Sequence, residues 1–215
     1  MLLKKRIAWV LLAVAVLINS VALADVTLGQ SNALRSALSY LDYSAFSHDG
    51  LIDQLEYEGY TKQEATYAAD HCDADWNEQA LKSAESYLAY TAFSYKGLIE
   101  QLEYEGFTTE EATYAADHVQ INGNEQALKS AQDYLAYSAF SYTGLIGQLE
   151  YEGYTTQEAT YAADHCAADW KEQAAKSAKA YLDYAPFSRS GLIDQLEYEG
   201  FTREEAVYGV EENGY

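Results

Sequence analysis

Proline, basic residues and long apolar segments are all scarce in this sequence. Proline occurs once in 215 residues, at Pro186, so no proline-rich linker divides the chain. No segment shows the β-branched alternation that is typical of strands. The longest apolar run, residues 7–18, has 12 residues, whereas a helix that spans a bilayer needs ~20. These absences predict a continuous helical array with no transmembrane span once an N-terminal signal has been removed.

The shortage of basic residues excludes several classes of partner. The chain has 13 lysines and arginines against 34 aspartates and glutamates, and its formal net charge is −21. Contact with nucleic-acid phosphates needs clustered lysine and arginine, so no nucleic-acid partner is expected, and an anionic membrane surface is disfavoured. This balance is typical of a soluble, self-repelling protein or of one that meets a basic partner.

The N-terminus has the three parts of a secretory signal peptide. Residues 4–6 are basic, residues 7–18 are apolar, and residues 22–24 form an Ala-Leu-Ala cleavage site. We therefore expect a signal peptide over residues 1–24 and an exported protein, whether extracellular, on the cell surface or periplasmic. Loss of the three basic residues changes the charge from −21 to −24. An uncleaved N-terminal anchor is the alternative interpretation.

Four copies of one 47-residue unit fill the rest of the chain. The triplet Gly-Leu-Ile begins at Gly50, Gly97, Gly144 and Gly191, a constant step. A fixed period of this length is typical of stacked helical units, in which function lies on a repeated surface. After a short segment, 25–32, the repeats are predicted at 33–79, 80–126, 127–173 and 174–215, the last with a polar tail. Residues shared by copies 1 and 3, and by copies 2 and 4, indicate two pairs.

Helix-capping signals divide each unit into three short helices, which makes the predicted fold class all-α. Ser47 can cap the second helix, and Gly59 stands where a left-handed C-terminal cap is expected. Thr61 with Glu64 forms a capping box at the start of the third helix. Asp75 has the same role at the first helix of the next copy. This arrangement predicts a helix-turn-helix shape in every unit.

The candidate catalytic and metal-binding patterns have a structural interpretation. Asp-His recurs in three copies, and Cys72 and Cys166 follow it in copies 1 and 3. Adjacent residues on a helix point about 100° apart, so they rarely converge on one atom. Val119 replaces the cysteine in copy 2, which favours a packed thiol over a ligand. No catalytic, metal-binding or cofactor-binding residue is therefore predicted, and the protein is not expected to be an enzyme.

The two cysteines leave three alternatives open. Cys72 and Cys166 occupy equivalent positions two units apart, and in an open stack that separation exceeds the ~7 Å Cα limit for a disulfide. Free buried thiols, an intramolecular bridge between folded-back pairs, and an intermolecular bridge are all compatible with an exported protein.

A Glu-Tyr-Glu triplet after the second helical segment is the candidate partner-binding surface. It supplies acidic side chains together with tyrosine, whose amphipathic ring suits protein interfaces. A solvated helix face is the alternative. The predicted partner-binding residues are Glu56, Tyr57, Glu58, Glu103, Tyr104, Glu105, Glu150, Tyr151, Glu152, Glu197, Tyr198 and Glu199.

The repeated motif resembles the Ltp family of host cell surface-exposed lipoproteins. The residues that carry the resemblance are Ala-Leu-Lys-Ser-Ala, Gly-Leu-Ile-x-Gln-Leu-Glu-Tyr-Glu-Gly and Tyr-Ala-x-Asp-His, from about Ala33 to Gly209. The resemblance implies tandem helix-turn-helix domains outside the cytoplasmic membrane. Some members exclude superinfecting phage by blocking DNA injection, with acidic repeat surfaces engaging the phage tape measure protein. Members carry a lipobox cysteine, but Asp25 follows Ala24 here, so no lipid anchor is expected.

Two functions follow from these observations. The first is a non-enzymatic exported protein that binds a protein partner through its acidic, aromatic repeats, such as a phage tape measure protein during superinfection exclusion. The alternative is a structural or adhesive module of the cell envelope that binds wall polymer or another surface protein.

Overall fold

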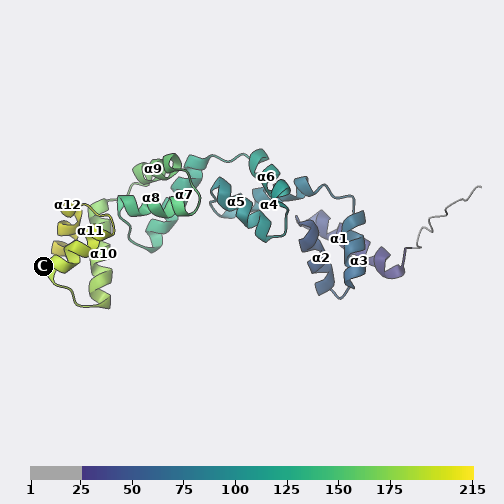
Figure 1. Cartoon of the computed structure of the whole chain (residues 1–215), viewed down its shortest axis with the longest axis horizontal. Helices are drawn as coiled ribbons and strands as arrows, with labels where there is room; N and C mark the ends of the chain where they lie inside the picture. Colours follow the sequence, from purple (N-terminus) through teal and green to yellow (C-terminus); the bar gives the residue numbers. More distant parts are fainter. Residues whose placement is uncertain (1–25) are drawn as a thin grey trace, which may run out of the picture.

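The computed structural model describes residues 26–215, and this part of the chain is all-α. Its twelve helices form four units of three helices, which lie in a row (Figure 1). The expectation of four three-helix repeats is confirmed. Unit 1 contains α1 (Leu28–Tyr43), α2 (His48–Tyr57) and α3 (Lys62–His71); unit 2 contains α4 (Trp76–Tyr90), α5 (Tyr95–Tyr104) and α6 (Thr109–His118); unit 3 contains α7 (Gly123–Tyr137), α8 (Tyr142–Tyr151) and α9 (Thr156–His165); unit 4 contains α10 (Trp170–Tyr184), α11 (Arg189–Tyr198) and α12 (Arg203–Glu212).

The helix ends lie at the capping residues. The Ser47 hydroxyl accepts from the Gly50 N–H at 2.9 Å and so caps α2. Thr61 and Glu64 form the reciprocal capping box of α3, which satisfies two backbone donors at once. Gly59, with φ +98°, has the left-handed conformation that only glycine adopts without strain. The repeat divisions drawn from the 47-residue period, such as 79/80, fall inside first helices, whereas the helical units begin at the caps.

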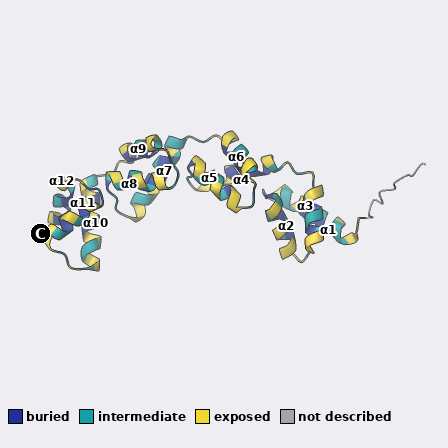
Figure 2. Ribbon diagram, viewed as in Figure 1, coloured by how far each residue is buried: buried dark blue, intermediate teal, exposed yellow. Residues whose placement is uncertain are grey.

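Each unit has a hydrophobic core of its own. In unit 2, Leu98 and Leu102 of α5 are fully buried against alanines of α4 and α6. Burial of each leucine stabilises the unit by about 1.5–3 kcal/mol. The small alanine side chains allow the first and third helices to approach closely, and the most extensive helix contacts all lie within units. Figure 2 shows buried residues on the inner helix faces of every unit.

Two of the three junctions between units contain a tryptophan. Trp76 begins α4 in unit 2 but packs against the core of unit 1, where its ring meets the His48 ring edge-on at 5.2 Å. Trp170 repeats this contact between units 4 and 3, against Tyr142 at 5.5 Å. Gly123 stands at the same position between units 2 and 3 and has no side chain to insert. The pairing expected from the sequence therefore has a structural basis in two tryptophans.

Cys72 and Cys166 are free, buried thiols in separate cores, those of units 1 and 3. Of the three alternatives for the cysteines, the structure shows the packed one. Each Sγ donates to a carbonyl one turn earlier in its own helix, which satisfies the thiol locally.

The predicted signal peptide, residues 1–24, lies outside the described residues. Among residues 26–215, no helix is long and apolar enough to cross a membrane.

Candidate functional site: helix ends and seams

The predicted Glu-Tyr-Glu triplets lie at the C-terminal ends of the second helices. In each, the tyrosine is the last helical residue and the final glutamate is the C-cap. The tyrosine side chains of the four triplets are 84–88% exposed and contribute nothing to the cores. The row of units therefore presents the same helix end four times, and we call these four triplets the Glu-Tyr-Glu ends.

The first glutamate of the triplet is hydrogen-bonded from the third helix in units 2, 3 and 4. Glu103 and Glu150 accept hydrogen bonds from Thr109 at 2.6 Å and Thr156 at 2.5 Å. In unit 4, Arg203 donates to Glu197 at 2.9 Å. These bonds orient the carboxylates at the helix end and leave acceptor capacity for a partner, because an ionised carboxylate accepts about four hydrogen bonds.

The last glutamate of each end is tied to the first helix by tyrosine in three units. The hydroxyl of Tyr87 donates to Glu105 at 2.5 Å, and Tyr40 and Tyr181 make the same bond to Glu58 and Glu199. The bond to Glu58 raises the pKa of Tyr40, because the neutral phenol is the form that donates.

Unit 3 lacks this bond. The Tyr134 hydroxyl accepts from Gln148 at 3.1 Å, and none of the hydrogen bonds among the described residues involves the Glu152 carboxylate. Burial raises the pKa of Glu152, since the charged form is poorly solvated there. This unit therefore presents a half-buried carboxylate that differs from its three equivalents.

A second set of tyrosines, which the sequence interpretation missed, is equally exposed. Each is the last residue of a first helix, and the exposed fractions are 84–93%. The sequence pattern that marks these exposed tyrosines is Tyr-Leu-x-Tyr, just before the capping serine of the second helix. Its first tyrosine packs on phenylalanine, as Tyr40 does on Phe46 at 5.5 Å, so only the second is free. The four residues are Tyr43, Tyr90, Tyr137 and Tyr184.

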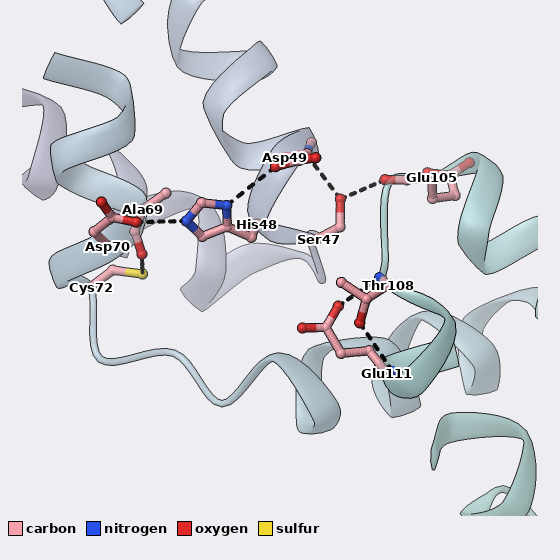
Figure 3. Close-up of polar contacts among 10 residues, drawn as sticks. Ser47, His48, Asp49, Ala69, Asp70, Cys72, Glu105, Thr108 and Glu111 are labelled. Atoms are coloured by element: carbon pink, nitrogen blue, oxygen red, sulfur yellow. Dashed lines mark hydrogen bonds and ion pairs between the residues drawn. The ribbon is translucent and has the colours of Figure 1, made fainter. Parts of the chain in front are cut away.

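Neighbouring units meet end to end through their second helices. The Ser47 hydroxyl, besides capping α2, donates to the Glu105 carbonyl at the end of α5 at 2.5 Å (Figure 3). Ser94 and Ser141 make the same bond to the next unit, at 2.5 Å and 2.6 Å. The positive end of one helix dipole thereby faces the negative end of the next. We call each of these three contacts a seam.

Glycine makes the close approach at a seam feasible. Gly106 has φ +88°, and a Cβ atom there would lie 2.9 Å from the Ser47 hydroxyl oxygen. The three seam serines are only 2–3% exposed, so the next unit covers them. The Glu-Tyr-Glu ends of units 2, 3 and 4 are therefore fixed against a neighbour, whereas no neighbouring unit within residues 26–215 covers the end of unit 1.

Grooves run beside the seams. Between units 3 and 4 a groove of about 780 Å³ is lined by Tyr137, Lys176, Tyr181 and Glu199, among others. Another, of about 550 Å³ between units 2 and 3, includes Glu152 in its wall. Both tyrosine sets and the last glutamates thus contribute to concave surfaces between units.

The Asp-His pairs have local partners. His71 Nδ1 donates to the Tyr67 carbonyl at 2.8 Å, and its ring stacks on Tyr67 at 4.1 Å. Asp70 instead binds His48 Nε2 of α2 at 2.9 Å (Figure 3). Within residues 26–215, no group of three or more histidine, cysteine or acidic residues is placed to hold a metal ion.

Comparison with protein families decides the relationship. The family described as host cell surface-exposed lipoprotein matches the chain four times, over residues 29–72, 75–119, 122–166 and 169–212. The chain belongs to this family. Each match coincides with one three-helix unit, and the resemblance stated from the sequence is confirmed. No curated protein and no solved structure matches the chain significantly.

Membership in the host cell surface-exposed lipoprotein family supports a location on the cell surface. The Glu-Tyr-Glu motif lies within every matched stretch, so the candidate surface is part of the family unit.

Proposed function

We propose that this member of the host cell surface-exposed lipoprotein family is a non-enzymatic binding protein that captures a basic protein segment through its Glu-Tyr-Glu ends. The single observation that carries the proposal is the fourfold presentation of an exposed tyrosine beside acidic side chains at one repeated helix end. We further propose that the partner is a phage protein such as the tape measure protein, so that binding blocks DNA entry.

The helix dipole disfavours carboxylates at these helix ends. The C-terminus of a helix carries partial negative charge, so an acidic residue there is unfavourable by about 0.3–1 kcal/mol. The last turns of α2, α5, α8 and α11 contain no basic residue that would offset this cost. A positively charged partner segment would relieve the repulsion, which favours binding of lysine-rich or arginine-rich chains.

The exposed tyrosines suit the same partner. A tyrosine that is almost fully exposed contributes no core packing, but its ring can cover apolar and cationic groups of a bound segment. Four equivalent ends also allow one extended partner to bind at several units, which raises the overall affinity when the spacing matches.

The proposal is tested by phage challenge of cells that express the full-length chain. Adsorption and DNA entry are scored separately, because a block at injection leaves adsorption normal. The test variant carries Tyr→Ser at the four exposed end tyrosines, Tyr57, Tyr104, Tyr151 and Tyr198. These side chains lie outside the cores, so helicity should be unchanged by circular dichroism.

A matched charge experiment separates the acidic component from bulk charge. Glu→Gln at Glu56, Glu103, Glu150 and Glu197 should weaken exclusion. The control removes four exposed carboxylates elsewhere, by Asp53→Asn, Glu85→Gln, Glu110→Gln and Asp194→Asn. If both variants lost exclusion equally, net charge alone would explain the effect. Normal infection by a broad phage panel, with sedimentation on purified envelope material, would instead support the adhesive alternative.

A further inference from the structure

The two ends of the row expose the two halves of a seam. Ser188 caps α11 as the seam serines cap their helices, accepting from the Gly191 N–H at 3.1 Å, but it is exposed and its hydroxyl pairs with that of Ser190 at 3.4 Å. At the other end, Glu58 and Gly59 terminate α2, and Gly59 is exposed as well. The donor half thus lies on unit 4 and the acceptor half on unit 1.

Both halves have the geometry of the occupied seams. Gly59 has φ +98°, close to the values of +88° to +92° at the three seam glycines, and no atom of the described part of the chain lies within 4 Å of a Cβ built there. Ser190 stands where Thr143 stands in unit 3. The Thr143 hydroxyl donates to the Gly200 carbonyl of the next unit at 3.1 Å, and serine carries the same donor.

The junction between the two pairs also fits a contact between two chains. Unit 4 resembles unit 2, because Phe201 and Phe107 occupy equivalent positions. Unit 1 resembles unit 3, because Gly29 and Gly123 occupy equivalent positions. A second copy placed after unit 4 would therefore meet it through a seam like that of units 2 and 3, with Asn32 where Gln126 accepts from the Phe93 N–H at that junction. The Tyr215 hydroxyl bonds to the carbonyl of Phe187, next to Ser188, and leaves Ser188 exposed.

We propose that a second copy of this chain docks head to tail on the first, with unit 4 of one copy against unit 1 of the next. In this contact Ser188 donates to the Glu58 carbonyl and Ser190 donates to the Gly59 carbonyl. The contact is heterologous, because each copy uses a different surface, so its repetition gives an open row of copies. The positive N-terminal end of α11 then faces the negative C-terminal end of α2 in the next copy, which is favourable.

The strength of the contact depends on concentration and salt. Inside the chain a covalent linker keeps the units together, whereas between chains the same few hydrogen bonds must overcome the lost freedom of two molecules. The excess of acidic over basic residues adds repulsion, which salt screens. Association is therefore weak at low salt and increases at the high local concentration of a surface or a concentrated solution.

The test uses isotope-labelled protein containing residues 26–215, the part with all four cores. Amide chemical shifts are recorded from micromolar to millimolar concentration in moderate salt. We expect concentration-dependent shifts confined to the two ends, at residues 58–60 and 188–191. Sedimentation equilibrium over the same range should show a rising average mass.

The blocking variant is Ser190→Trp, which places a bulky side chain at the docking surface and keeps the Ser188 cap. The matched control is Asp194→Trp, one turn further along α11 and also exposed. The proposal requires the shifts and the mass increase to disappear in Ser190→Trp and to persist in Asp194→Trp. Invariant shifts up to millimolar concentration, shifts at other residues, or equal behaviour of the two variants would overturn it.

Discussion

A seam serine donates a hydrogen bond to the next unit and the serine at the open end does not, so comparing the two measures the energy of the seam bond. Ser94 caps α5 and also donates to the Glu152 carbonyl of the next unit, whereas Ser188 caps α11 and has only the neighbouring Ser190 hydroxyl, at 3.4 Å, as a further partner. Loss of an N-cap serine costs about 0.5–2 kcal/mol. A hydrogen bond between neutral groups adds about 0.5–1.5 kcal/mol. We therefore expect Ser94→Ala to cost about 1 kcal/mol more than Ser188→Ala.

The measurement must resolve individual units, because a repeat array does not unfold as one two-state domain. Native-state hydrogen exchange gives the opening free energy of amides in α5 and α11. The opening free energy of the α5 amides should fall more in Ser94→Ala than that of the α11 amides does in Ser188→Ala. Protection should also fall in unit 3, across the seam. Equal losses for the two variants, with unit 3 unaffected, would refute the seam as an energetic contact.

Three further predictions concern other contacts. Burial lowers the pKa of His48, but hydrogen bonds to Asp70 and Asp49 raise it more, so the pKa lies above its ordinary value. Protonated His48 therefore stabilises unit 1 fully below about pH 6.5, and this stabilisation is lost as pH rises through the raised pKa. His48→Tyr, the residue of units 2 and 3, should flatten the pH dependence of the opening free energy of unit 1. Trp76→Gly should weaken unit 1 by about 2 kcal/mol in hydrogen exchange, although the substitution lies in unit 2. Leu102→Ala should cost about 2–5 kcal/mol and remain confined to unit 2, because its core is separate.

The helices were predictable because their signals are local. Thr61 with Glu64 and Ser47 with the following apolar face define helix ends within a few residues, and such caps act without tertiary context. Burial of Cys72 followed from its replacement by Val119 in copy 2. The three-helix unit was therefore visible in the sequence.

The seams were not predictable, because they depend on how units meet. The second hydrogen bond of Ser47 joins residues 58 positions apart, and no local pattern distinguishes it from an ordinary cap. The exposed end of the first helix, at Tyr43, was missed for a related reason: composition does not separate a core tyrosine such as Tyr40 from its exposed neighbour. Because the four Glu-Tyr-Glu triplets are identical in sequence, the different environment of the Glu152 carboxylate was also not predictable.

The most direct measurement of the central claim is infection of cells that express either the native chain or the variant with Tyr→Ser at the four Glu-Tyr-Glu ends. We expect normal adsorption with blocked DNA entry for the native chain, and restored entry for the variant at equal surface abundance. Blocked entry that persists in the variant would contradict binding through these helix ends.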